Sequence, residues 1–238
     1  MSKKIALITG ANKGIGFETA KQLGKADVKV IAASRNKERG EKAVAALVAD
    51  GIDAEFLQLD VDNATDIQHA FEYINSTYGK LDILVNNAGI QIESDNWGEN
   101  TSATIDEKVL RQTFETNFIN VVKLTNTLLP LIKKSDAGRI VNLSSILGSL
   151  TLHADAGSPI YGSKLFAYDA SKTALNAYTV HLSAALADTN IKVNSAHPGW
   201  VKTDMGSDAA PMNVADGAKT SVELALLGND GPDRKSVV

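Results

Sequence analysis

The chain alternates short apolar segments with longer segments of helical periodicity along most of its length. The apolar segments are rich in Ile, Val and Leu and lie next to turn residues, which is typical of buried strands. One of the helical segments is long, rich in Ala, Leu and Lys, and free of proline. Strands are expected at 3–9, 28–34, 54–60, 81–87, 138–145 and 191–198, and helices at 16–23, 37–48, 66–78 and 166–186.

This repeated strand–helix–strand order predicts an α/β protein. Parallel strands joined by helices form a sheet whose two faces are both covered by helices. Right-handed crossovers make that arrangement a Rossmann-type, doubly wound sheet. The 238 residues fit a single domain spanning 1–238, without a linker, a low-complexity segment or a long repeat.

Composition and charge exclude several classes of function. A net charge of -4 argues against a nucleic-acid or anionic-membrane surface. The absence of cysteine excludes disulfides and thiolate chemistry, and the four histidines are too scattered for a zinc motif. The first apolar segment is too short to span a membrane and lacks a cleavage-site pattern, so a cytoplasmic protein is expected.

A glycine-rich segment, "TGANKGIG", joins the first predicted strand to the first helix. Gly10, Gly14 and Gly16 free the backbone for a tight turn and for the close approach of a pyrophosphate. The N–H groups at the start of the following helix then face the phosphate oxygens. The alternative is a glycine-rich turn without a ligand, but its position in the first βαβ unit favours a dinucleotide site.

The segment "YGSKLFAYDASK" contains two tyrosine–lysine pairs. Tyr161 precedes Lys164 by three residues, and Tyr168 precedes Lys172 by four. A tyrosine can donate a proton near neutral pH when a cation stabilises its anion. Positions i and i+4 share a helix face, which favours Tyr168 and Lys172. The alternative is an ordinary solvated helix pair that has no role in chemistry.

Several short motifs occur together and in order: "TGANKGIG", "LDV", "NNAG", "VNLSS", "YDASK" and "PGWVKTDM". In this order, from Lys4 to about Gly228, the chain resembles the short-chain dehydrogenase/reductase family, and more closely its carbonyl-reductase branch. That resemblance implies a nicotinamide cofactor and a carbonyl or alcohol substrate. The cofactor-binding residues that it implies are Gly10, Asn12, Lys13, Gly14, Ile15, Gly16, Arg35, Asp60, Val61, Asn87, Ala88, Gly89, Tyr168, Lys172, Pro198, Gly199, Val201 and Thr203.

The resemblance also implies four catalytic residues. Tyr168 is expected to be the general acid for reduction, and Lys172 to lower its pKa and to bind the nicotinamide ribose. Ser145 is expected to orient the substrate carbonyl, with Ser144 as the alternative at the same strand end. Asn117 is expected to hold a water that links Lys172 to solvent. Asn120 is the alternative for that role.

The end of the second predicted strand distinguishes NADP from NAD. An acidic residue there would accept hydrogen bonds from the ribose 2′-OH and repel a 2′-phosphate. The segment "AASRN" instead contains Arg35, whose guanidinium can pair with a phosphate, and Lys13 adds a second cation. The alternative is that both are solvated surface charges. We expect NADP(H).

Two regions depart from the family pattern. Ser145 and Tyr168 are 23 positions apart, so residues 147–163 form an insertion that we expect to border the substrate pocket. We expect Tyr161 at the pocket rim and His153 as an exposed loop residue. The last strand is expected to be short or missing, and the chain could be a monomer or a homo-oligomer. Trp97 and a lid at 200–212 are expected to help close the pocket.

The predicted function is NADPH-dependent reduction of an aldehyde or ketone. The partner is a small-molecule carbonyl substrate, with no nucleic acid and no membrane. A β-ketoacyl carrier-protein reductase is one alternative, and a basic cluster near the pocket mouth would favour it. A regulator that senses NADP(H) without turnover is another, although the tyrosine–lysine pair argues against it.

Overall fold

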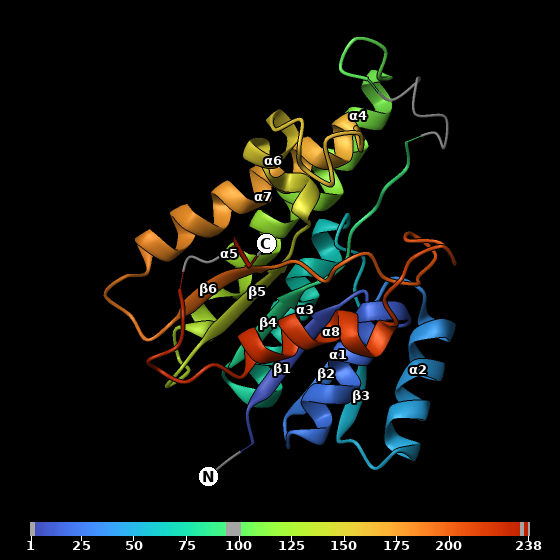
Figure 1. The fold of residues 1–238 in the computed structure, drawn as a ribbon. Coiled ribbons are helices and arrows are strands. Elements are labelled where there is room, and N and C mark those ends of the chain that lie inside the picture. Colours follow the sequence, from blue (N-terminus) through green and yellow to red (C-terminus); the bar gives the residue numbers. More distant parts are fainter. Residues whose placement is uncertain (1–2, 94–100, 234–235, 238) are drawn as a thin grey trace.

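The structure is a computed structural model that describes residues 3–93, 101–233 and 236–237. In this part of the chain seven strands form one sheet in the order β3-β2-β1-β4-β5-β6-β7, and neighbouring strands are parallel (Figure 1). The predicted Rossmann-type fold is confirmed, and each predicted strand lies within two residues of its expected ends. The strands are β1 (Ile5–Thr9), β2 (Lys29–Ser34), β3 (Ala54–Gln58), β4 (Ile83–Asn86), β5 (Arg139–Leu143), β6 (Lys192–Ala196) and β7 (Ser236–Val237).

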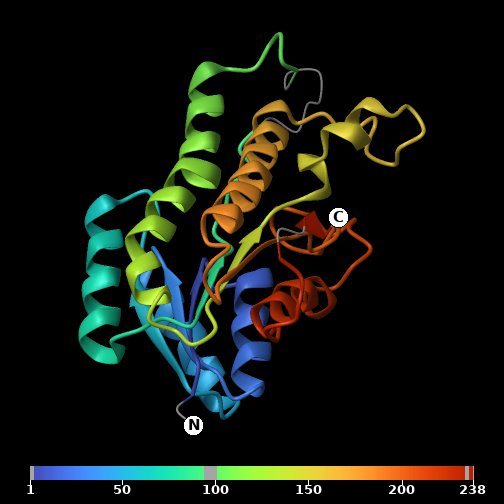
Figure 2. The same cartoon turned by 90° about the vertical axis from the view of Figure 1, so that its left-hand side faces the viewer.

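Helices cover both faces of the sheet, as Figure 2 shows. α1 (Gly14–Lys25), α2 (Lys37–Ala49) and α8 (Val214–Ala225) pack on one face. α3 (Ala64–Tyr78), α5 (Asn120–Ile132) and α7 (Phe166–Ala185) pack on the other. α5 continues from α4 (Glu107–Phe114) through a π-helical turn, η2 (Glu115–Ile119). A short 3-10 turn, η3 (Ile146–Gly148), and helix α6 (Leu150–Ala154) lie between β5 and α7.

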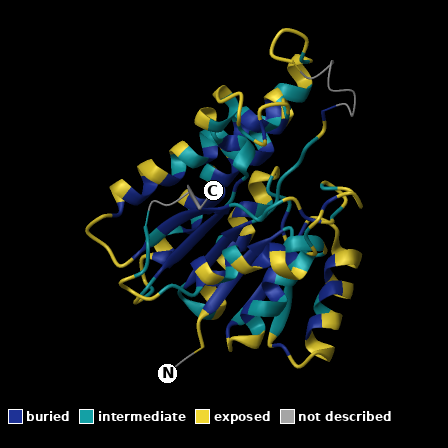
Figure 3. Ribbon diagram, viewed as in Figure 1, coloured by how far each residue is buried: buried dark blue, intermediate teal, exposed yellow. Residues whose placement is uncertain are grey.

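The alternation of side chains along each strand creates two hydrophobic cores. In β1, Leu7 joins the core that includes Leu124 and Leu128 of α5, whereas Ile8 joins the core that includes Leu23 of α1. All five residues of β1 are buried, because both faces of a parallel sheet are covered. Figure 3 shows the buried strands in dark blue and the exposed outer sides of the helices in yellow.

The order in which successive strands are placed in the sheet reverses between β1 and β4. These strands are neighbours, although β2 and β3 separate them in the sequence. A ligand crevice forms where the carboxyl ends of two such strands part. The glycine loop follows β1 and the segment 86–89 follows β4, so the fold brings both sequence motifs to this crevice.

The last strand is short, as the sequence indicated. β7 contains only two residues, and Ser236 and Val237 pair with Ser195 and Ala196 of β6. The preceding segment also covers the edge of β6 through side-chain contacts. Asp233 accepts hydrogen bonds from the Val193 N–H of β6 at 2.9 Å and from the Ser183 hydroxyl of α7 at 2.6 Å. These contacts replace part of the ladder that a longer strand would form.

Candidate active site

The glycine loop connects β1 to α1 in a conformation that requires glycine. Gly10 and Gly14 have φ values of 64° and 56°, which side chains rarely adopt. A Cβ on Gly16 would lie only 2.4 Å from Asn87 Nδ2. Lys13, the N-cap of α1, makes no side-chain cap hydrogen bond, so within the described chain the first N–H groups of α1 can face an anion. The loop also contains Asn12 and Ile15, both half-buried.

The segment after β4 forms hydrogen bonds to the glycine loop from the other side of the crevice. Asn87 Nδ2 donates to Thr9 O at 2.8 Å and to Gly10 O at 3.3 Å. The backbone N–H groups of Asn87 and Ala88 both donate to Thr9 Oγ1. Asn87 therefore acts on the protein backbone and fixes the shape of the loop.

Two of the predicted cofactor residues are exposed cations near the loop. Arg35 follows β2, whose end is tied to the loop by a 2.9 Å hydrogen bond from Ala11 N to Ala33 O. Lys13 forms an ion pair with Asp204, and this contact lowers the pKa of Asp204. No local pattern indicates this partner, since the two residues are 191 positions apart.

The predicted adenine-side residues lie in the turn after β3. Asp60 and Val61 are half-buried there. Asp60 Oδ1 accepts a hydrogen bond from the Asp62 N–H at 3.1 Å, and the Asp60 N–H donates to Asp66 at 2.9 Å. These contacts fix the turn.

The segment after β6 reaches the glycine loop. Pro198 and Gly199 begin it, and Gly199 has a φ of 86°. Val201 is buried and forms an isolated parallel bridge with Met212. Thr203 Cγ2 lies 3.4 Å from the position that a Cβ on Gly14 would take. Residues 198–203 therefore lie beside the predicted phosphate-binding turn.

Helix α7 carries both Tyr168 and Lys172 on one face. The Lys172 side chain is buried at 5% exposure, and its Nζ lies 5.4 Å from the centroid of the Tyr168 ring. The same Nζ donates to the carbonyl of Leu143, the last residue of β5, at 2.8 Å. A Cβ on Gly89 would lie 3.6 Å from this Nζ, so the lysine lies where the segment after β4 meets the end of β5.

The two candidate serines after β5 differ in their surroundings. Ser145 is the N-cap of η3, accepts the Leu147 N–H at 3.2 Å and forms a hydrogen bond with Tyr168. Ser144 is buried, and its hydroxyl has no hydrogen-bond partner in the described chain. The geometry therefore brings Ser145 to the tyrosine.

The two candidate asparagines also differ in their surroundings. Asn117 lies in the π-helical turn η2, and its amide bonds both the N–H and the carbonyl of Ile90 at 2.8 Å. Its Oδ1 lies 3.2 Å from the Cβ position of Gly89, beside Lys172. Asn120 instead donates to Asp62 at 2.9 Å. A π-helical turn often marks a functional site, because it changes where the backbone groups point.

Burial controls the protonation of the tyrosine–lysine pair. It raises the pKa of Tyr168 to about 12, while the hydrogen bond with Ser145 lowers it and Asp169 raises it. It also lowers the pKa of Lys172 to about 8. In the chain alone desolvation dominates the Tyr168 pKa, and the Lys172 ammonium donates to a carbonyl. The lowering of the Tyr168 pKa by Lys172 stays a prediction.

The structure of the insertion at 147–163 corrects one expectation. His153 is not an exposed loop residue: it lies in α6 with 13% of its side chain exposed, 2.9 Å from Leu147 O and 3.3 Å from Asp169. Lys164 follows the insertion and precedes α7, which begins at Phe166. Its ammonium lies 4.9 Å from the Tyr161 ring centroid, and that ring is 47% exposed.

Sequence reasoning missed two residues at the site. Glu93 is buried and accepts the backbone N–H groups of Ala167 and Tyr168. The Nδ1 atom of His197 accepts the Ile146 N–H at 3.1 Å, directly after Ser145, and burial lowers the pKa of this histidine. No local pattern indicates either contact, although His197 directly precedes the "PG" motif. Trp97 lies outside the described residues.

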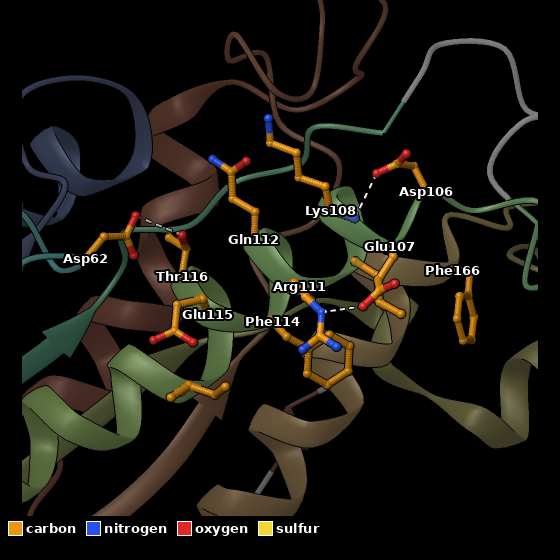
Figure 4. Close-up of a pocket in the computed structure, with 12 residues that line it drawn as sticks. Asp62, Asp106, Glu107, Lys108, Arg111, Gln112, Phe114, Glu115, Thr116 and Phe166 are labelled. Carbon is orange, nitrogen blue, oxygen red and sulfur yellow. Dashed lines mark hydrogen bonds and ion pairs between the residues drawn. The ribbon is translucent and has the colours of Figure 1, made fainter.

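A groove of about 1210 Å³ lies along α4 and η2 (Figure 4). Asp62, Phe166 and ten residues between Asp106 and Ile119, not including Asn117, line it. Its charges are mixed, since Glu107 pairs with Arg111 at 2.7 Å. The groove contains none of the predicted catalytic residues, and it is not the basic cluster that a carrier-protein reductase would need.

The described residues contain neither a candidate membrane span nor a candidate metal cluster. No helix there is long and apolar enough to cross a membrane. No group of three or more His, Asp or Glu side chains there could hold a metal ion.

Comparisons with known proteins agree with this geometry. The family model "short chain dehydrogenase" matches residues 4–213. "Carbonyl reductase [NADPH] 1" of Mus musculus is 34% identical, over 96% of this chain and 93% of the relative. The structure of salutaridine reductase from Papaver somniferum has a TM-score of 0.81 at 29% identity and covers 98% of both chains. A short-chain dehydrogenase structure from Escherichia coli CFT073 with NADPH has a TM-score of 0.80 at 27% identity and covers 94% of this chain and 91% of that one. The chain is therefore a member of the short-chain dehydrogenase/reductase family, in the branch that resembles the carbonyl reductases.

Proposed function

We propose that this oxidoreductase uses NADPH to reduce an aldehyde or ketone. One observation carries the proposal: Ser145, which follows β5, and the Tyr168–Lys172 pair of α7 meet at the crevice beside the glycine loop. A proton donor, a hydroxyl that can orient a carbonyl and a cation are the groups that carbonyl reduction requires.

The residues around the crevice fit a dinucleotide. The space beside Gly10 and Gly16 is too narrow for a side chain, which leaves the backbone N–H groups of the loop to approach a pyrophosphate. Arg35 is exposed at the end of β2, where a guanidinium would pair with a 2′-phosphate. When bound, the nicotinamide supplies the hydride. Lys172 would bind its ribose hydroxyls, and Val201 and Thr203 would border the nicotinamide.

Tyr168 is the proton donor in this scheme. With a pKa raised to about 12 its hydroxyl stays protonated at neutral pH, so the protein alone favours donation to the developing alkoxide. Lys172, with a pKa of about 8, keeps its charge there and stabilises the tyrosinate that remains. Ser145 would donate to the carbonyl oxygen and orient it. Asn117 would position the water that returns the proton.

Two segments would border the substrate. The insertion at 147–163 and the lid at 200–212 both follow Ser145 in the chain, and the insertion contains the short helix α6. Trp200 and Met205 are 57% and 49% exposed, which suits an apolar substrate surface. Support for the choice of cofactor comes from the NADPH in the names of the mouse relative and of the Escherichia coli structure.

The test is NADPH oxidation against a panel of aldehydes, ketones and quinones, with Tyr168→Phe as the control. We expect turnover of at least one class by the wild type and loss of turnover in the variant, with NADPH binding retained. Tight NADPH binding without any turnover would favour a sensor. Turnover restricted to β-ketoacyl groups on a carrier protein would favour the carrier-protein reductase.

A further inference from the structure

The helix that carries Tyr168 and Lys172 has no local cap at its start. Leu165, the N-cap residue of α7, offers no side-chain cap hydrogen bond. The cap is supplied from a distance by Glu93, in the loop that follows β4. Its carboxylate accepts the Ala167 N–H at 2.8 Å and the Tyr168 N–H at 3.0 Å. A group 75 positions away therefore holds the backbone of the proposed proton donor.

Glu93 is well suited to hold this turn rigidly. Its side chain is buried at 6% exposure. An unpaired carboxylate there would cost folding free energy, so the hydrogen bonds from the two backbone N–H groups are needed to offset its burial. The positive end of the helix dipole strengthens both bonds. Without this carboxylate, two N–H groups in the first turn of α7 would lose their partner.

The neighbouring charges argue against a role in stability alone. Asp169 lies next to Tyr168 and is also buried. One of its oxygens accepts the Leu165 N–H at 3.0 Å and lies 3.3 Å from His153, while the other is buried without a partner in the described chain. Burial and the charge of Glu93 raise the pKa of Asp169 to about 7. Two buried carboxylates at one helix start repel each other, whereas a serine or asparagine would cap at no such cost.

We propose that Glu93 is a positioning residue for the reaction proposed above. By holding the first turn of α7, it fixes the Tyr168 hydroxyl in line with Ser145 and beside Lys172. The inference rests on the proposed function, because it concerns the same proton donor. A displacement of about 1 Å at a reacting group can cost roughly a hundredfold in rate.

The test compares Glu93→Ala, Glu93→Asp and Glu93→Gln with Asp106→Ala. Asp106 is the matched control, since its carboxylate caps α4 through the N–H groups of Lys108 at 2.7 Å and Val109 at 3.3 Å. We expect Glu93→Ala to lower kcat by about tenfold or more with the KM for NADPH nearly unchanged. Glu93→Asp, which is one methylene shorter, should also lose kcat. Glu93→Gln keeps one acceptor oxygen and can bind only one of the two N–H groups, so it should recover only part of kcat. Asp106→Ala should lose stability without losing kcat.

Hydrogen exchange of the Ala167 and Tyr168 amides supplies a readout that does not depend on activity. It should accelerate in Glu93→Ala and not in Asp106→Ala. Wild-type kcat in Glu93→Ala would refute the proposal. If that variant does not fold, wild-type kcat in Glu93→Asp would refute it equally. If the wild type turns over no substrate, the proposed function fails, and exchange still reports whether Glu93 holds the turn.

Discussion

Lys172 should limit the stability of this protein while it supports activity. Its side chain is buried, and burial lowers its pKa from 10.5 to about 8. At 1.36 kcal/mol per pKa unit, keeping this ammonium charged near pH 7 costs about 3 kcal/mol of folding free energy. Lys172→Met removes that cost and loses the hydrogen bond to Leu143 O, worth about 1 kcal/mol.

The variant should therefore be more stable by about 2 kcal/mol and fully inactive. For a chain of this length, that gain corresponds to a Tm higher by about 4–8 °C. Thermal unfolding without cofactor, near pH 7, measures it. Lys42→Met is a suitable control, because Lys42 is exposed on α2 and its replacement should leave the Tm nearly unchanged.

The pH dependence of the folding stability tests the same reasoning, because its sign follows from the lowered pKa of Lys172. Between about pH 8 and 10.5 the unfolded chain holds the proton that the native Lys172 has lost, so the wild type gains stability as pH rises through this range. The advantage of Lys172→Met should shrink by about 1 kcal/mol from about pH 7 to about pH 9. A variant less stable than the wild type, or an advantage that does not change with pH, would refute the reasoning.

Four further substitutions test the roles of single residues. Arg35→Asp should raise the KM for NADPH by about tenfold or more and that for NADH much less, in steady-state kinetics, because it loses a charge-assisted bond to the 2′-phosphate. Ser145→Ala should lower kcat by about a hundredfold, whereas Ser144→Ala should leave it near the wild-type value, because the Ser144 hydroxyl has no described partner. Lys164→Met should shift the pH profile only slightly, because Lys164 precedes α7. A larger loss of kcat than in Lys172→Met would show that the wrong pair had been chosen.

The sequence predicted the sheet well because its strands are buried on both faces. Segments such as Ile5–Thr9 are apolar throughout, so a short run of Ile, Leu and Val is enough to place them. The sequence also predicted the tight turn of the glycine loop, because glycine stands at the two positions with positive φ, Gly10 and Gly14. These features depend on neighbours within a few residues, and such local patterns survive in a single sequence.

The structure of the insertion was predicted less well, because contacts between residues far apart in the sequence determine it. The sequence alone predicts His153 as an exposed loop residue. In the structure the ring lies between Leu147 O and the Asp169 carboxylate, and it is mostly buried. Only the folded chain brings α6 against the start of α7, so no local pattern could indicate this environment. The same holds for the ion pair of Lys13 with Asp204.

The start of α7 shows how a sequence can indicate a missing partner without naming it. A helix usually begins after Ser, Thr, Asp or Asn, and Leu165 is none of these. The first N–H groups of α7 must still be satisfied, because Ala167 is fully buried. An uncapped start next to the proposed proton donor therefore predicts an acceptor from elsewhere in the chain. Its identity, Glu93, depends on where the loop after β4 passes, which only the sheet order fixes.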